Sequence, residues 1–192
     1  MDGAVAKTDS RWLTSGLHVP LATAAGAGAA VLATGWAELT GFALLAVGCA
    51  LLTVTDLAAL RLPDVIVGPL YLIIFGALAV AALIDGDPMP LARAVGAAVA
   101  MAAVYFVLAF ISPSSLGMGD VKLAGILGAF LGWLGWSNAL LGLLAAFLLA
   151  GAVALMLLIT IRASRRTDFA FGPLMIAGAA LGAAGGLHIL PV

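Results

Sequence analysis

The sequence predicts an all-α fold, a polytopic membrane helix bundle of about seven transmembrane helices. Three observations support this fold class. Hydrophobic residues make up 65% of the chain and charged residues only 9%, a balance that no water-soluble domain of this size shows. The mean hydropathy is +1.25. Apolar stretches recur from residue 17 to the C-terminus, and each approaches the ~20 residues that a helix needs to cross the hydrocarbon. A single-pass anchor is therefore excluded, and residues 1–192 are expected to form a single integral membrane domain.

Each helix is placed by an apolar run between polar or helix-breaking residues. The predicted helices cover residues 17–35, 40–55, 65–84, 91–111, 120–134, 138–161 and 171–190. The first follows a tail at 1–16 whose Lys7 and Arg11 suggest a secretory signal. Its apolar run is longer than the ~7 to 15 residues of a signal core, however. We therefore expect an uncleaved extra helix ahead of a six-helix core at 40–190.

The connections between these helices are short. Two of them carry clear breakers, Asp-Gly-Asp-Pro-Met-Pro at 85–90 and Ser-Pro-Ser-Ser at 112–115, which end helices on both sides. The fifth helix is short for a full span. No connection is long enough to fold as a separate soluble domain.

Glycines and tryptophans indicate how the helices pack and where they meet the membrane surface. Small residues at four-residue spacing let membrane helices approach closely. Such pairs are Gly128 with Gly132, Gly178 with Gly182, and Gly182 with Gly186. Tryptophans gather at membrane interfaces, and Trp12, Trp36, Trp133 and Trp136 all lie near predicted helix ends.

The distribution of basic residues predicts the orientation of the chain. If each apolar segment crosses once, seven of the eight basic residues fall on one side of the membrane and only Arg93 falls on the other. The seven are Lys7, Arg11, Arg61, Lys122, Arg162, Arg165 and Arg166. By the positive-inside rule, the N-terminus is cytoplasmic and the C-terminus lies outside. Asp56 and Asp120 then share the cytoplasmic face of the cell membrane.

Charge and cysteine content exclude several classes of function. The formal net charge is −1, and no long basic cluster suggests nucleic acid as a partner. Cys49 is the only cysteine, so neither an intramolecular disulfide nor a cysteine zinc site can form. We expect no metal and no cofactor. The expected partners are the lipid bilayer and a protein substrate; the oligomeric state is not indicated.

Two aspartates are the candidate catalytic residues. Asp120 closes a glycine-rich turn just before an apolar segment, and Asp56 ends another apolar segment. A carboxylate at the membrane edge is costly to keep without a function. Two neighbouring carboxylates cannot both ionise easily, so one keeps a proton while the other takes one from water. Asp56 could instead be a solvated acid at a helix end, and Asp120 an acid stabilised near a helix N-terminus, where the macrodipole favours negative charge. Asp64, at the start of the third helix, is an alternative to Asp56 as the partner of Asp120.

Four further residues are expected to shape this site. Gly117 and Gly119 precede Asp120, and side chains there would obstruct an extended substrate or forbid the turn. Pro63 follows Asp56 in the next connection. Lys122 lies two residues beyond Asp120, a spacing that does not favour a salt bridge between them. We expect Lys122 to extend to lipid headgroups or to tune the local potential.

Three stretches resemble the type IV prepilin peptidase family of membrane aspartic proteases. They are Asp-Leu-Ala-Ala-Leu-Arg-Leu-Pro-Asp at 56–64, Gly-Met-Gly-Asp-Val-Lys-Leu at 117–123 and Phe-Ala-Phe-Gly-Pro-Leu at 169–174. The family's first catalytic aspartate precedes a proline by seven positions, which matches Asp56 and Pro63. Its second lies in a Gly-x-Gly-Asp-x-Lys run, which matches Asp120 and Lys122. The likeness spans about three quarters of the chain.

The resemblance implies removal of the short basic leader from prepilin or pseudopilin precursors at the cytoplasmic membrane face. Large bifunctional members insert a cytoplasmic domain, often with paired CxxC motifs, that is associated with N-methylation. Here the connections are short and Cys49 stands alone. The chain therefore resembles the compact, peptidase-only members that serve tight-adherence pili, and N-methyltransferase activity is not expected.

Three other interpretations remain open from the sequence. A proton-coupled small membrane transporter or channel could use Asp56 and Asp120 to carry protons or cations. A protease of the presenilin or signal-peptide-peptidase kind would also contain Gly-x-Gly-Asp. A non-catalytic assembly factor would keep the helices but would not need the acids.

Overall fold

The computed structural model describes residues 23, 26–28, 30–59, 62–111, 116–160 and 170–189. Within these ranges the ordered elements are helices and none is a strand, which confirms the all-α prediction. The helices are α3 (Trp36–Ala59), α4 (Asp64–Asp85), α5 (Met89–Ile111), α6 (Met118–Leu134), α7 (Trp136–Thr160) and α8 (Gly172–Ile189). The tail at 1–16 lies outside the described residues, as do residues 17–22, 24, 25 and 29 of the extra helix predicted at 17–35. The described residues 23, 26–28 and 30–32 of that segment are helical.

Long apolar runs produce most of these helices. Four of them, α3, α4, α5 and α7 over Trp136–Ile159, are long and apolar enough to cross a membrane. The chain is a membrane protein. α6 has 17 residues, which corresponds to about 26 Å at ~1.5 Å per residue. The fifth predicted helix is therefore short, as expected. The predicted bounds agree well with the observed ones, and the largest difference is in α3, which is four residues longer at each end.

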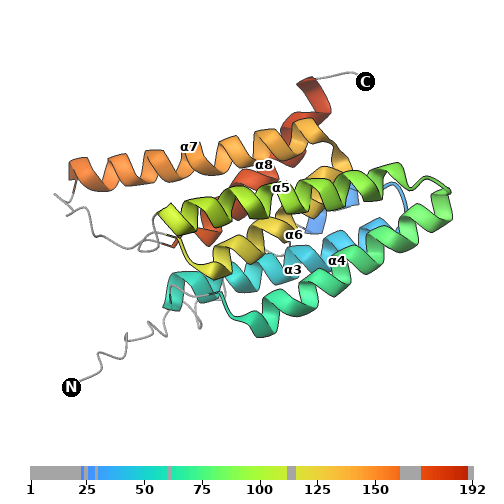
Figure 1. Ribbon diagram of the computed structural model, residues 1–192, viewed down its shortest axis with the longest axis horizontal. Helices are drawn as coiled ribbons and strands as arrows, with labels where there is room; N and C mark the ends of the chain where they lie inside the picture. Colours follow the sequence, from blue (N-terminus) through green and yellow to red (C-terminus); the bar gives the residue numbers. More distant parts are fainter. Residues whose placement is uncertain are drawn as a thin grey trace.

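The helices lie roughly along one axis and alternate in direction (Figure 1). At one end of the bundle α3, α5 and α7 finish and α4, α6 and α8 begin. We call this the acid end, because it contains Asp56 and Asp120. The other end, where α3 begins and α6 finishes, contains Glu38 and Trp133 and is called the far end.

Glycines set the spacing of two helix pairs. A Cβ on Gly128 would lie 2.7 Å from the carbonyl oxygen of Ala97, and one on Gly132 would lie 2.9 Å from that of Arg93, so α6 packs directly on the backbone of α5. Likewise, Cβ atoms on Gly178 and Gly182 of α8 would lie 2.5 Å from backbone atoms of α7. These two predicted pairs are confirmed; Gly186 falls outside the side chains that the structure describes.

Helix α6 lies in the middle of the bundle and contacts α4, α5, α7 and α8. It meets α3 mainly through long side chains. The rings of Phe42 on α3 and Phe130 on α6 pack edge to face with centroids 5.0 Å apart. By contrast, α4, α5 and α7 expose large apolar side chains such as Leu72, Phe110 and Leu148. Such surfaces suit contact with lipid.

The tryptophans do not all lie at the interface. Trp36 and Trp136 are more than half exposed, as an interfacial position requires. Trp133 is buried, and its indole Nε1 donates a hydrogen bond of 2.8 Å to Glu38 Oε1. The prediction that Trp133 belongs to the interfacial belt is therefore wrong, because a buried carboxylate on another helix accepts the indole N–H. Trp12 lies outside the described residues.

Candidate active site

Asp56 lies in the last turn of α3 and is buried, with 5% of its surface exposed. The backbone N–H of Gly172, the first residue of α8, donates a hydrogen bond of 2.9 Å to Asp56 Oδ2. This contact is close, because a Cβ on Gly172 would lie 2.8 Å from the same oxygen. A residue 116 positions away in the sequence thus holds the carboxylate of Asp56.

Asp120 is the third residue of α6 and lies in its first turn. The backbone N–H of Gly117, which precedes the helix, donates a hydrogen bond of 2.9 Å to Asp120 Oδ2. A carboxylate at this position is favoured by the positive end of the helix macrodipole and by the free N–H groups of the first turn. The local geometry therefore agrees with the interpretation that a helix N-terminus stabilises Asp120.

Both aspartates lie at the acid end, and one side chain packs close to a neighbour of each of them. Leu62, in the connection between α3 and α4, lies 2.8 Å from where a Cβ on Gly119 would be. The same side chain lies 3.5 Å from where a Cβ on Gly172 would be. The fold thus brings the two acids, 64 positions apart in sequence, to one end of the bundle.

The two glycines before Asp120 differ in what they contribute. Gly119 has no room for a side chain, because its Cβ would clash with Leu62. Gly117 has φ −91° and ψ 162°, a conformation that any residue adopts, and its Cβ would lie at an ordinary 3.7 Å from Asp120 Oδ2. The expectation that a side chain at position 117 would forbid the turn is therefore wrong.

The remaining predicted site residues form the edge of this region. Pro63 is extended, at φ −71° and ψ 129°, and precedes the first turn of α4. Lys122 Nζ forms an ion pair of 2.7 Å with Asp64 Oδ1, and both side chains are substantially exposed. Lys122 thus reaches Asp64 rather than lipid headgroups, because α4 begins beside α6. Asp64 is engaged in this exposed pair, whereas Asp56 is buried and accepts a hydrogen bond from Gly172 of α8.

Sequence reasoning missed Leu62 and Gly172, which hold the site together through contacts between distant segments. Gly172 lies within the third stretch of family likeness at 169–174, and that was the only signal for it.

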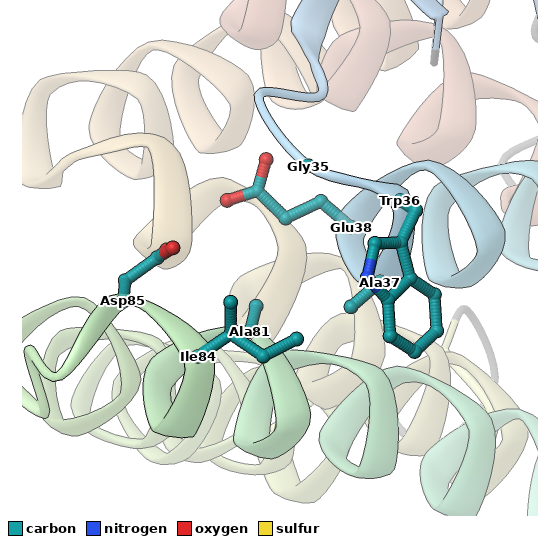
Figure 2. Close-up of a pocket in the computed structure, with 7 residues that line it drawn as sticks. All are labelled: Gly35, Trp36, Ala37, Glu38, Ala81, Ile84 and Asp85. Carbon is teal, nitrogen blue, oxygen red and sulfur yellow. The ribbon is translucent and has the colours of Figure 1, made fainter.

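A hollow at the far end of the bundle lies between α3 and α4 (Figure 2). It is lined by Gly35, Trp36, Ala37, Glu38, Ala81, Ile84 and Asp85. Glu38 already accepts hydrogen bonds from Thr34 and Trp133, and most of the other lining residues are apolar. This hollow is therefore a poorer candidate for chemistry than the acid end.

The acid end can support general acid–base catalysis. Each aspartate receives one backbone hydrogen bond, and within the described part of the chain no donor reaches its second oxygen. Two such carboxylates can hold one proton between them and bind a water. Within the same described residues, no group of three or more His, Cys, Asp or Glu could hold a metal ion.

Comparison with known proteins gives one match. A family model described as the type IV leader peptidase family matches residues 43–159. These residues include both aspartates and extend from α3 to the end of α7. No curated protein and no solved structure matches the chain significantly.

Proposed function

Because this chain belongs to the type IV leader peptidase family, we propose that it is an aspartic endopeptidase that cleaves the short basic leader from type IV pilin-like precursors. The family membership itself confirms the prediction made from the three sequence stretches and indicates a peptidase. The proposal adds the catalytic dyad, Asp56 and Asp120. The observation that carries it is that these two acids, from α3 and α6, lie at the same end of the bundle, where Leu62 packs close to both Gly119 and Gly172.

The helix positions of the acids suggest which one holds the shared proton. Asp120 lies in the first turn of α6, where the macrodipole favours a charged carboxylate. Asp56 lies in the last turn of α3, where the macrodipole disfavours one. We therefore assign Asp120 as the ionised general base and Asp56 as the protonated general acid.

In the proposed reaction, Asp120 takes a proton from water while the water oxygen bonds to the carbonyl carbon of the scissile peptide. Asp56 gives its proton to the carbonyl oxygen. In the second step the C–N bond breaks, the nitrogen takes the proton held by Asp120, and the hydroxyl proton returns to Asp56. No covalent enzyme intermediate forms, and both carboxyls end in their starting states.

The proposal also covers the location of the protein and its orientation in the membrane. The active site faces the cytoplasm, the protein is a multi-pass protein of the cell membrane, and the C-terminus lies outside. The support is the seven-to-one distribution of basic residues. Of these residues the structure describes Arg93 and Lys122, which lie on α5 and α6 toward opposite ends of the bundle. A peptidase without methyltransferase activity fits the lone Cys49 and the short connections.

The positions of the acids argue against a transporter. An acid that carries ions through a membrane protein is expected along the pathway, near the middle of the bilayer. Asp56 is three residues from the end of α3, and Asp120 is the third residue of α6. Both acids are thus at one edge of the bundle.

The test is conversion of a co-expressed pilin-like precursor to its mature length. Asp56→Asn and Asp120→Asn each remove the acid–base function, and we expect the rate to fall by at least about 1,000-fold. Membrane insertion and thermal stability should remain near wild type, because asparagine has the same shape. Asp85→Asn, at the far end of α4, is the matched control and should process normally. Processing at the normal rate by either active-site variant would refute the dyad.

A further inference from the structure

Tyr105 on α5 is a buried polar residue for which neither the fold nor the proposed dyad gives a reason. None of its surface is exposed. Its hydroxyl is the one buried side-chain polar atom, within the described residues, that has no hydrogen-bond partner. Burying a hydroxyl in this way is costly, and phenylalanine would fill the same space without that cost. The hydroxyl is therefore expected to have a function.

The packing of α5 on α6 places Tyr105 level with Asp120. The two helices are antiparallel, and Gly128 of α6 lies against Ala97 of α5. Asp120 precedes Gly128 by eight residues, and Tyr105 follows Ala97 by eight. Eight residues correspond to a rise of about 12 Å along each helix, so Tyr105 and Asp120 lie at about the same level along the bundle.

The ring of Tyr105 is held rigidly by two other aromatic side chains. It stacks on Phe147 of α7 with centroids 5.4 Å apart and an interplanar angle of 17°. It meets Phe171 edge to face at 6.0 Å. Phe171 directly precedes Gly172, whose N–H holds Asp56. The Tyr105 ring is thus packed against the segment that binds one catalytic acid and lies level with the other.

We propose that Tyr105 is a third polar residue of the active site and that its hydroxyl donates a hydrogen bond to the hydrolytic water. This inference rests on the proposed function of Asp56 and Asp120. A buried water needs about three hydrogen-bond partners. The two carboxyls can accept both water protons, and the Tyr105 hydroxyl can donate to one lone pair. The second lone pair is then left facing the peptide carbonyl, which orients the water for attack.

The other tyrosine provides a matched control. The chain has two tyrosines. Tyr71 of α4 also packs against α6, but its hydroxyl donates a hydrogen bond of 2.8 Å to the carbonyl oxygen of Lys122. Tyr71→Phe therefore removes a hydroxyl that stabilises the fold, whereas Tyr105→Phe removes one that has no partner among the described residues.

Steady-state kinetics on purified enzyme and a pilin-like precursor make the first test. For Tyr105→Phe we expect kcat to fall about 10- to 100-fold, because the water is less well oriented. KM should be unchanged, and the melting temperature should be unchanged or higher. For Tyr71→Phe we expect a lower melting temperature and a normal kcat. If Tyr105 only fills space, Tyr105→Phe keeps the wild-type kcat, and that result would overturn the inference.

Infrared spectroscopy tests the same hydrogen bond without substrate. An O–H stretching band of a bound water, identified by its shift in H₂¹⁸O, is expected in the wild type. It should be displaced or lost in Tyr105→Phe and in Asp120→Asn, and it should persist in Tyr71→Phe. A band unaffected by Tyr105→Phe, or no such band in the wild type, refutes the role of Tyr105. Failure of the proposed function is distinguished separately, because it appears as normal processing by Asp56→Asn.

Discussion

Glu38 and Asp120 occupy equivalent positions at opposite ends of the bundle, each in the first turn of its helix. Each uses one carboxylate oxygen to accept a backbone N–H that precedes the helix, from Thr34 to Glu38 and from Gly117 to Asp120. Their second oxygens differ. That of Glu38 accepts the indole N–H of Trp133, whereas that of Asp120 receives no hydrogen bond from the described residues. Both oxygens of Glu38 therefore accept hydrogen bonds within the fold, whereas one oxygen of Asp120 remains available for catalysis.

At the far end, side-chain hydrogen bonds tie three helices together. Arg93 of α5 donates hydrogen bonds of 2.6 Å to the carbonyl oxygens of Gly132 and Trp133, which satisfies the last turn of α6. Glu38 joins α3 to that same turn. The two helices that carry the aspartates are thus fixed to each other at the end remote from the site. We interpret the far end as the part that sets the spacing of α3 and α6.

Gly172→Ala is the substitution expected to affect the acid end most strongly, apart from loss of an aspartate. The new methyl would lie 2.8 Å from Asp56 Oδ2 and would meet Leu62, so the carboxyl must move. A displacement of about 1 Å in a catalytic group can cost about 100-fold in rate, and we expect a loss of this size in precursor processing. Gly76→Ala, on α4 with nothing within 4 Å, is the control and should process normally.

Glu38→Ala tests the far end and should reduce stability rather than chemistry. It leaves the buried Trp133 indole N–H without an acceptor, at a cost of about 1 to 3 kcal/mol. The exposed Thr34 hydroxyl loses the same acceptor but can bind water instead. We expect a lower melting temperature in detergent. Glu38→Gln retains an oxygen for the indole and should lose less.

The activity of correctly folded Glu38→Ala is the decisive measurement. Because the site lies at the other end of α3, kcat for the folded fraction should stay within roughly twofold of wild type. A large fall in kcat without a loss of stability would contradict the division into a structural end and a catalytic end.

The sequence predicted the helices well because their signals are local. Long apolar runs and Gly/Pro connections define α3 to α8 without knowledge of the tertiary fold, and glycine spacing correctly indicated which faces of α6 and α8 pack closely. Asp56 and Asp120 could be singled out because carboxylates at the ends of apolar segments are rare.

The errors share a physical cause, which is a partner distant in the sequence. Trp133 was expected at the interface because it lies near a helix end, yet Glu38, 95 positions earlier, accepts its indole N–H. Lys122 was expected to reach lipid headgroups or to tune the local potential, and it pairs with Asp64, 58 positions before it. Leu62 supports the site through packing, and Gly172 supports it through a backbone N–H that donates to Asp56. Such pairings depend on which helices are neighbours in the bundle, and the hydropathy of the sequence does not determine that arrangement.

Asp64→Asn is expected to have the smallest effect, although it removes the nearest other acid to the dyad in sequence. Its ion pair with Lys122 is 2.7 Å long, but the two side chains are 71% and 43% exposed, so water and salt screen the interaction. Such surface pairs contribute about 0 to 1 kcal/mol, and raising the ionic strength should reduce even this difference. Thermal denaturation of Asp64→Asn, Lys122→Gln and the double variant at two salt concentrations would measure the coupling. A precursor-processing defect in Asp64→Asn as severe as that of Asp56→Asn would mean that Asp64, and not Asp56, is the partner of Asp120.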